Sequence, residues 1–327
     1  MRFSLAGTMG FGSFEEIVEA AQTAEELGFS AFYTSDHLFG VAGAPPETPL
    51  MEAWTLAAAL APVTKRLRLG CFVAGVTYRH PAMLAKITST IDVISGGRLE
   101  LGIGAAWSRE DHVAYGLPFP SLKERQERLE EAVEIIHGLW TNDRFTFDGR
   151  HYQVADAPCE PKPVQKPRPP FLIAAVGERG IRLTARRAQV WASVSTPAFA
   201  SQCIERIREQ CRAVGRDPGE IEFSAYTGLL LTDDAEKVRT TVQRRVGQLA
   251  TAQRRPAMAQ ARSAVEGETL EDQVRASLLA GNPDEVRQAI QRYVDVGVTH
   301  VVIMTPRPFQ RSLLERFRRE VMAAFIG

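Results

Sequence analysis

A histidine, a tryptophan and a glutamate follow short apolar runs at positions where they could take part in chemistry. His37 comes after the run 30–34, and Trp107 and Glu110 come after the glycine-containing run 98–104. Imidazole titrates near neutral pH, so His37 is the best single candidate for a general acid or base. Trp107 offers a flat face over which a ring system or substrate could stack. A histidine that only bonds a loop carbonyl and a core tryptophan are the structural alternatives.

Further polar side chains near these runs have both a chemical and a structural interpretation. Glu110 and His112 stand two apart and would form an acid–base pair if their loop folds over the mouth, although a solvated loop carries such residues too. His80 precedes Pro81, so it is either a ligand or the residue that begins a helix. Asp36 caps a turn in the structural interpretation.

The segment Gly177-Glu178-Arg179-Gly180 lies between a predicted strand and a predicted helix. Bare backbone N–H groups at such a place, together with the helix dipole, attract a phosphate. A tight turn without a ligand is the alternative, because a glycine pair alone is not specific.

The order of the elements indicates how these segments come together. Short β-branched runs alternate with amphipathic helices, as in a parallel sheet with helical crossovers. Ser13 and Glu16, for example, form a capping box at the start of the first helix. The eight predicted strands are 2–7, 30–34, 67–76, 98–104, 171–176, 189–194, 221–231 and 299–304. Right-handed crossovers make them parallel and close them into one (β/α)8 TIM barrel over residues 1–327, so their carboxyl ends converge on one cavity.

Two insertions interrupt this pattern, at about 141–170 and 232–280. The first contains a predicted hairpin, 145–152, with Asp148-Gly149 at its turn, followed by six prolines that force extended backbone. The second could form a lid whose cations meet an anionic ligand, although a solvated helix surface explains most of its arginines more simply. These arginines include Arg239, Arg244, Arg245, Arg254, Arg255 and Arg262.

Two other architectures compete with the barrel: a doubly wound sheet with an added domain, and two α/β domains divided at the proline-rich segment. The second is weakened because the later strands would have no dinucleotide fingerprint of their own. Gly102-Ile103-Gly104 lacks a third glycine at the required place, and no helix begins directly after it. It is therefore not a Rossmann signature.

Composition and charge argue against several classes of function. The 327-residue chain is 45% hydrophobic and 24% charged, which is typical of a globular protein. Lys and Arg number 39, as do Asp and Glu, so no net field favours a nucleic acid or an anionic membrane. The four cysteines are scattered without a C-x-x-C pair, so neither a zinc site nor a disulfide framework is expected. We find no export signal or membrane span in the sequence and expect a cytoplasmic location.

Several segments together resemble the luciferase-like monooxygenase superfamily, specifically its flavin- or deazaflavin-dependent oxidoreductases. The segments that carry the resemblance are 24–29, 35–38, 78–81, 90–104, Trp107 with Glu110 and His112, 114–120, 128–132, the proline run and 215–218. They extend over most of the chain, and the part from Ser95 to Gly104 is specific. Tyr78-Arg79-His80-Pro81 is similar to the branch that uses coenzyme F420.

The resemblance implies a TIM-like barrel, often dimeric, that binds a flavin-type cofactor at its carboxyl face. Members use either FMN, which activates oxygen, or coenzyme F420, which moves a hydride at a deazaflavin carbon. A bulge with a non-prolyl cis peptide would back the ring, the turn at 177–180 would hold the phosphate, His37 would face the reacting centre and Trp107 would border the substrate. The residues assigned to the cofactor are Asp36, Phe72, Val73, Ala74, Tyr78, His80, Gly177, Glu178, Arg179 and Gly180, and those assigned to catalysis are His37, Trp107 and Glu110.

The leading hypothesis is therefore hydride transfer between coenzyme F420 and a small organic substrate in a homodimeric enzyme. An FMN-dependent monooxygenase and a non-catalytic flavin-binding barrel are alternatives. A metal-assisted hydrolase is a further class, but His37 and His80 lack the clustered ligands that such sites use, so no metal is expected. Two departures from the family pattern could alter the pocket: Ala106 stands where relatives often have glycine, and Gln189 where many have aspartate.

Overall fold

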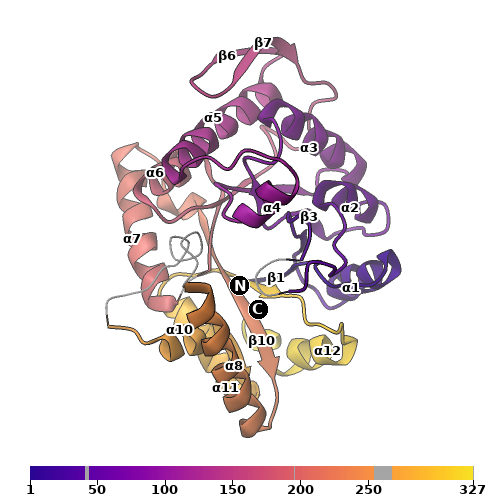
Figure 1. The fold of residues 1–327 in the computed structure, drawn as a ribbon, viewed down its shortest axis with the longest axis vertical. Coiled ribbons are helices and arrows are strands. Elements are labelled where there is room, and N and C mark those ends of the chain that lie inside the picture. Colours follow the sequence, from indigo (N-terminus) through magenta and orange to yellow (C-terminus); the bar gives the residue numbers. More distant parts are fainter. Residues whose placement is uncertain (41–43, 195, 254–266, 327) are drawn as a thin grey trace.

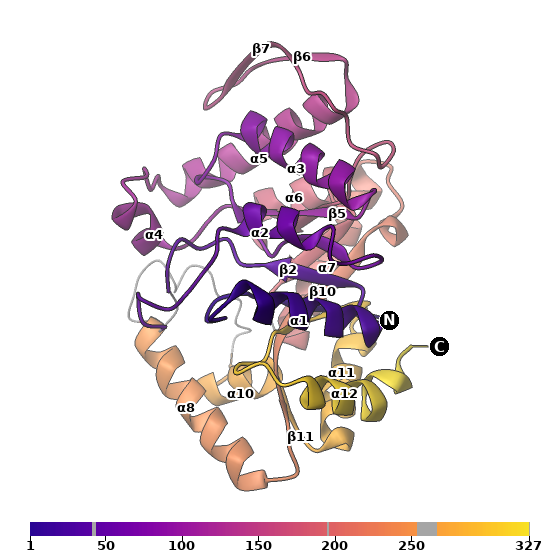
Figure 2. The same cartoon turned by 90° about the vertical axis from the view of Figure 1, so that its right-hand side faces the viewer.

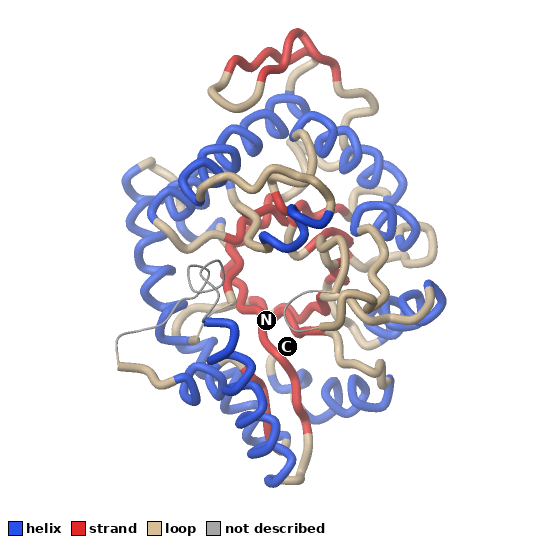
Figure 3. Tube along the Cα trace, viewed as in Figure 1, coloured by secondary structure: helices blue, strands red, loops and turns tan. Residues whose placement is uncertain are grey.

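Eight parallel strands close into a barrel at the centre of the molecule (Figures 1 and 3). The computed structural model describes the chain apart from residues 41–43, 195, 254–266 and 327. The barrel strands are β1 (Arg2–Ala6), β2 (Ala31–Thr34), β3 (Arg68–Cys71), β5 (Leu99–Gly104), β8 (Phe171–Ala174), β9 (Val190–Ser193), β10 (Glu222–Leu231) and β12 (His300–Met304). Parallel pairing of β1 with β2 and β12, and of β9 with β10, closes the ring. The predicted barrel is confirmed, whereas a doubly wound sheet would be open.

Helices surround the barrel and cover the outer faces of its strands (Figure 3). Outward-facing Phe3, Leu5 and Phe32, for example, pack in one core with Ile17 and Ala21 of the first helix. The surrounding helices are α1 (Phe14–Glu26), α2 (Ala53–Leu60), α3 (Pro81–Ser95), α5 (Leu122–Thr141), α6 (Glu178–Arg187), α7 (Pro197–Ala213), α11 (Pro283–Asp295) and α12 (Arg311–Glu320). Within the described part of the chain, no helix has the length and apolar character needed to span a bilayer.

The third barrel strand is interrupted where the sequence predicts one continuous strand over 67–76. β3 ends at Cys71, a cis peptide bond joins Phe72 to Val73, and β4 (Ala74–Gly75) then resumes the pairing with β5. Gly102 lies against the interruption, since a methyl group there would come within 2.0 Å of the Cys71 carbonyl oxygen. The non-prolyl cis peptide that the resemblance implies is confirmed at this place.

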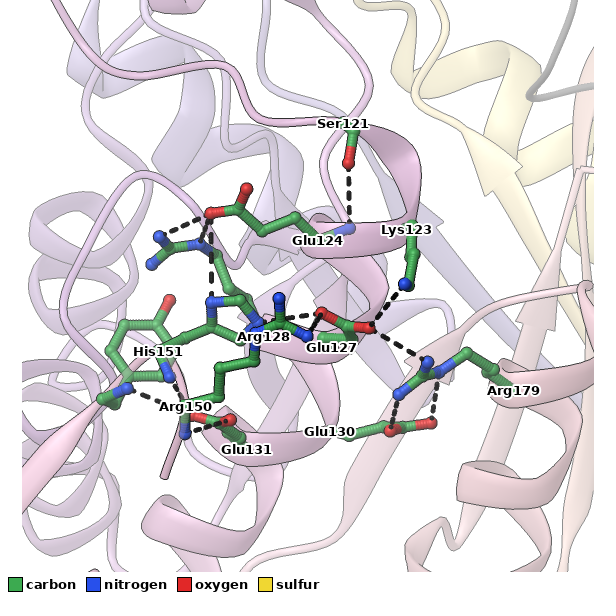
Figure 4. A network of polar contacts seen from close by, with 11 residues as sticks. Ser121, Lys123, Glu124, Glu127, Arg128, Glu130, Glu131, Arg150, His151 and Arg179 are labelled. Atoms are coloured by element: carbon green, nitrogen blue, oxygen red, sulfur yellow. Dashed lines mark hydrogen bonds and ion pairs between the residues drawn. The ribbon is translucent and has the colours of Figure 1, made fainter. Parts of the chain in front are cut away.

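The first insertion forms a hairpin that lies beyond α5 (Figures 1 and 2). Its strands are β6 (Arg144–Asp148) and β7 (Gln153–Pro158). The predicted turn at Asp148-Gly149 is confirmed only for Gly149, because Asp148 still pairs with Gln153 and the turn covers 149–152. β7 begins only after the predicted hairpin 145–152 has ended, so the hairpin is longer than the sequence suggested. The Glu131 carboxylate on α5 accepts hydrogen bonds from the backbone N–H groups of residues 150–152 at 2.9 to 3.1 Å. These bonds fasten the hairpin to the barrel's outer layer (Figure 4).

The described part of the second insertion contains two helices and a strand that the sequence did not predict. α8 (Ala235–Gln253) and α10 (Leu270–Ala276) are followed by β11 (Leu278–Gly281), which pairs in parallel with the end of β10. Arg239 and Arg244 are exposed on α8, as a solvated helix surface requires. Of the other arginines named above, Arg245 is half-buried, and Arg254, Arg255 and Arg262 lie outside the described residues.

Charged side chains fill the amino-terminal end of the barrel. Glu222 on β10 lies 2.8 Å from Arg2 Nη1 and 2.7 Å from His300 Nδ1, and His300 Nε2 lies 2.8 Å from Ser4 Oγ. Burial raises the pKa of Glu222, but His300 and Arg2 outweigh this effect and lower the pKa to about 2. Because this network occupies one end of the barrel, the carboxyl end is the one left for a ligand.

Replacing Glu222 with glutamine is expected to lower the free energy of unfolding by about 3 kcal/mol at neutral pH. The folded-state pKa is depressed, so the stabilisation is fully present above the unfolded value of about 4.5 and is lost as the pH falls toward 2. Denaturant unfolding at pH 7 and pH 3 should show the difference from wild type narrowing on acidification. Glu19→Gln, an exposed control, should change stability by less than about 0.5 kcal/mol. An undiminished difference at pH 3 would contradict this role for Glu222.

Candidate functional site

His37 and Trp107 meet at the carboxyl mouth of the barrel. His37 stands three residues after β2 and Trp107 three residues after β5, and their rings contact edge to face with centroids 5.1 Å apart. The His37 side chain is 19% exposed, so it is held by the protein but remains accessible from the mouth. The barrel therefore brings together the two residues whose chemistry the sequence analysis singled out first.

Asp111 holds His37 in place. It lies on α4 (Arg109–Ala114), whose first turn is capped by Ser108 Oγ. The Asp111 carboxylate is fully buried and lies 2.7 Å from His37 Nδ1, and it accepts hydrogen bonds from Leu38 N–H at 2.9 Å and Tyr78 Oη–H at 2.8 Å. Burial raises the pKa of Asp111, but these bonds outweigh it and leave the pKa below its usual value. Asp111 is therefore ionised at neutral pH.

An ionised Asp111 fixes which ring nitrogen of His37 carries a proton. A carboxylate can only accept, so Nδ1 donates and the neutral ring leaves Nε2 unprotonated. Among the described residues, no side chain or backbone group bonds His37 Nε2. This nitrogen is able to take a proton from a ligand in the mouth.

Asp36 does not have a free carboxylate to offer a ligand. Its two oxygens accept a bidentate pair of bonds from Arg79, each 2.9 Å long, and one of them also accepts Gly75 N–H at 3.0 Å. Burial raises the pKa of Asp36 more than Arg79 lowers it. The bond to Gly75 ties the end of β2 to β4, so Asp36 helps to position the Phe72–Val73 bulge.

The Phe72–Val73 bulge presents an aromatic wall to the barrel interior. Phe72 stacks on Tyr226 of β10 with ring centroids 5.1 Å apart, and it also contacts Tyr33 at 5.7 Å. Gly104 packs closely against Val73 and leaves no room for a side chain, since a methyl group there would lie 3.1 Å from Val73 Cγ2. The mouth thus has a flat apolar wall whose backbone is held by a neighbouring strand.

Glu110 and His112 do not form the acid–base pair that the sequence suggested, because their segment is the helix α4 and not a loop. Glu110 is exposed, whereas His112 is fully buried, with Nε2 2.6 Å from Thr77 Oγ1 and Nδ1 2.6 Å from the Ser108 carbonyl oxygen. Burial lowers the pKa of His112. In a helix, neighbours two apart point in different directions.

His80 begins α3, as the structural interpretation predicted. Its side chain is exposed, and Nδ1 accepts the Ala82 N–H at 3.2 Å. His80→Ala should therefore cost about 0.5 to 1 kcal/mol of stability, the usual value of a helix cap, and leave cofactor affinity unchanged. Thermal unfolding and a cofactor titration on the same variant check this. A large loss of cofactor affinity with normal stability would instead make His80 a ligand.

In the segment 177–180 the backbone and the side chains have different partners. Gly177 is the N-cap of α6 and provides no side-chain cap, so the first N–H groups of the helix have no bond to a capping side chain. Arg179 does not point to this place: its guanidinium pairs with Glu130 at 2.6 Å and Glu127 at 3.4 Å on α5 (Figure 4). Glu178 pairs with Arg182 one turn along its own helix. Only the backbone of this segment is available to an anion.

Comparison with known proteins places this arrangement in a family. A model of the family described as luciferase-like monooxygenase matches residues 2–300. The chain belongs to the luciferase-like monooxygenase family.

Curated relatives of this luciferase-like protein include F420-dependent glucose-6-phosphate dehydrogenases. The protein of Amycolatopsis mediterranei (strain U-32) is 27% identical over 317 residues, with 94% of this chain and 93% of the relative covered. That of Kineococcus radiotolerans (strain ATCC BAA-149 / DSM 14245 / SRS30216) is 29% identical, with 94% and 92% covered. These relatives share nearly the whole length of the chain.

Solved structures share the fold. An F420-dependent secondary alcohol dehydrogenase in complex with an F420-acetone adduct superimposes with a TM-score of 0.84 at 18% identity, covering 100% of this chain and 99% of the other. A coenzyme F420-dependent tetrahydromethanopterin reductase from Methanopyrus kandleri gives 0.79 at 22% identity, with 99% of both chains covered. The monooxygenase RslO1 from Streptomyces bottropensis gives 0.79 at 24% identity, with 100% of both covered.

The two departures from the family pattern affect different ends of this luciferase-like barrel. Ala106 lies beside the mouth and has a φ of 59°, the left-handed conformation that glycine adopts more easily. Gln189 instead accepts hydrogen bonds from Phe171 N–H and Arg168 at the amino-terminal ends of β8 and β9. The expectation that Gln189 could alter the pocket is therefore wrong.

The surroundings of the histidines in this luciferase-like protein can be compared with those that a metal-assisted hydrolase would need. In the part of the chain that the structure describes, no three His, Cys, Asp or Glu side chains are grouped so that they could hold a metal ion. His37 has one carboxylate neighbour, Asp111, and His80 caps a helix. This arrangement supports proton transfer better than metal binding.

Proposed function

We propose that this chain transfers a hydride between coenzyme F420 and a small organic substrate at the mouth of its barrel. The observation that carries the proposal is the His37–Asp111 pair, which lies beside the Phe72–Val73 bulge. Tyr78 and Asp36 connect the two features, since Tyr78 bonds Asp111 and Asp36 bonds the strand that follows the bulge. The F420-dependent relatives, at 27% to 29% identity, support this choice of cofactor over FMN.

The aromatic wall at the Phe72–Val73 bulge fits the face of a planar ring. Gly104 packs against this bulge, since a methyl group there would lie 3.1 Å from Val73 Cγ2 and 3.3 Å from the Ala174 carbonyl oxygen. A side chain at this position would therefore displace the bulge. The unsatisfied N–H groups at the start of α6 fit the cofactor phosphate, because helix N-termini bind anions.

Coenzyme F420, when bound, supplies a deazaflavin carbon that accepts or gives a hydride. For a substrate hydroxyl, His37 Nε2 would take the proton from the oxygen, and the carbon that bears this oxygen would give its hydride to the oxidised cofactor, which would leave a carbonyl. Asp111 stabilises the imidazolium that this transfer creates. Trp107 packs against the His37 ring and covers one side of it from water.

The expected rate effects agree with the separate roles of the cofactor and the protein side chains. Holding hydride donor and acceptor in contact supplies about 7 to 11 kcal/mol of barrier reduction. A positioned general base contributes about 10² to 10⁴ in rate. The protein side chains therefore need to provide only orientation and proton transfer.

The test is a fluorescence titration of the purified protein with oxidised coenzyme F420 and, separately, with FMN. We expect F420 to bind at least about tenfold more tightly than FMN. Gly104→Val should weaken F420 binding by displacing the Phe72–Val73 bulge, whereas Gly247→Ala, in open space on α8, should not. Circular dichroism checks that both variants fold. Tight FMN binding without F420 binding would make the protein a flavin monooxygenase, and no binding of either would overturn the proposal.

A further inference from the structure

Two arginines at the carboxyl end of the barrel lack a counter-ion among the described residues. Arg245 is half-buried on α8, and Arg307, which follows β12, is exposed; no described carboxylate, carbonyl or hydroxyl group bonds either guanidinium. The Arg307 guanidinium lies 5.6 Å from the centre of the Phe11 ring. The half-buried arginines Arg98, Arg168 and Arg216 each donate to backbone carbonyl oxygens. An unpaired guanidinium in a partly enclosed place is costly, so Arg245 needs an explanation, and Arg307 is free to bind an anion beside it.

Glycines make room for both guanidinium groups. A methyl group on Gly10 would lie 2.7 Å from Arg307 Nη1, and one on Gly228 would lie 2.6 Å from Arg245 Nη1. Gly10 follows β1 and Gly228 lies on β10, two residues beyond Tyr226. The backbone of the mouth therefore allows the two side chains to approach it closely.

The charges of both guanidinium groups affect the pKa of the Tyr226 phenol. Burial raises the pKa of Tyr226 to about 12, against the charges of Arg307 and Arg245, which lower it. A methyl group on Gly7 would lie 3.7 Å from Tyr226 Oη and 3.6 Å from Arg307 Nη2, so these two groups lie close to the same point beside Gly7. Within the described residues the Tyr226 hydroxyl has no hydrogen-bond partner, so it is a third free donor at the same place.

We propose that Arg245, Arg307 and Tyr226 form a subsite for an anionic group of the substrate, a carboxylate or a phosphate. Guanidinium groups bind the oxygens of both anions through charge-assisted hydrogen bonds, and a phenol adds a neutral one. The inference rests on the proposed function, because it takes the substrate to occupy the mouth.

The position of the subsite suits a substrate anchor. Ser35 Oγ lies 3.8 Å from the same point as the Tyr226 and Arg307 groups, and Ser35 is two residues before His37. An anion held there leaves the rest of a small molecule beside the His37 imidazole. The cofactor phosphate is proposed at the start of α6, after β8, whereas Arg245 lies on α8 against Gly228 of β10 and Arg307 lies after β12. The two anion sites are therefore separate.

The test is calorimetric titration of inorganic phosphate and of acetate into the cofactor-free protein. We expect one of the two anions to bind the wild type, and both Arg245→Gln and Arg307→Gln to weaken that binding by about tenfold or more. Arg244→Gln, an exposed neighbour on the same helix, removes the same charge and should change the affinity by less than about twofold. The more tightly bound anion identifies the substrate group as phosphate or carboxylate.

A second titration separates the substrate group from the cofactor's own anions. The F420 affinity of Arg245→Gln and Arg307→Gln should match that of the wild type; a tenfold fall would assign the arginines to the cofactor and overturn the proposal. Absence of anion binding to the wild type, unchanged anion binding in both variants, or an equal loss in Arg244→Gln would also overturn it. If F420 does not bind at all, the proposed function fails, but the phosphate and acetate titrations still decide whether the anion site exists.

Discussion

Replacing His37 with alanine is expected to lower kcat by about 10² to 10⁴ on any substrate that reduces bound F420. The reason is the free Nε2 at the mouth, which the variant removes while the cofactor contacts remain. The measurement is the steady-state rate of loss of oxidised-cofactor absorbance, together with cofactor affinity by titration. Affinity should change by less than about threefold, because the proposed cofactor contacts lie at the bulge and at the start of α6.

His137→Ala provides the matched control for this prediction. His137 is half-buried on α5 near the amino-terminal end of the barrel, and its Nδ1 has no hydrogen-bond partner within the described structure. Its removal should leave kcat unchanged within about twofold. Unchanged turnover in His37→Ala would remove His37 from the mechanism and favour a barrel that binds the cofactor without this base.

Asp111→Asn is expected to lower kcat by about 10² or more while cofactor affinity is kept. Asparagine has the shape of aspartate but presents an NH2 group as well as an oxygen. If the NH2 group faces His37, the ring must accept at Nδ1, which moves the proton to Nε2 and removes the base. Stability should also fall by about 1 to 3 kcal/mol, since Tyr78 and Leu38 N–H compete for one remaining oxygen. The dependence of kcat on pH should change as well as the magnitude of kcat.

Tyr78→Phe is the comparison for Asp111→Asn. It removes one bond to Asp111 but leaves the bond to His37 Nδ1, so kcat should fall by less than about tenfold. Glu110→Gln tests the carboxylate that the sequence favoured. A larger loss of kcat in Glu110→Gln than in Asp111→Asn would show that Asp111 does not support His37 and would contradict the assignment.

The barrel could be predicted because its signals are local. Strand and helix runs alternate, and caps such as Ser13 accept the expected N–H of Glu16. β11 escaped prediction because it is four residues long and depends on pairing with the extended end of β10, a contact distant in sequence. The break in the third strand depends likewise on Gly102 of a neighbouring strand.

The candidate site could be predicted only in part, because several of its contacts join residues that are distant in sequence. His37 and Trp107 come from strand ends, which a barrel brings together, so their contact follows from the topology. Asp111 was missed, although Ser108 stands three residues before it at the spacing of a helix cap, which would have turned the supposed loop into α4. Arg179 was misassigned because its partner Glu130 lies 49 residues away.

A crystal structure of the protein grown with oxidised coenzyme F420 would locate the ring and its phosphate. We expect electron density for a planar ring against Phe72 and Val73, with its reacting carbon on the side of His37 Nε2 and its phosphate at the N–H groups that begin α6. A ring bound elsewhere, or a phosphate far from α6, would contradict this expectation.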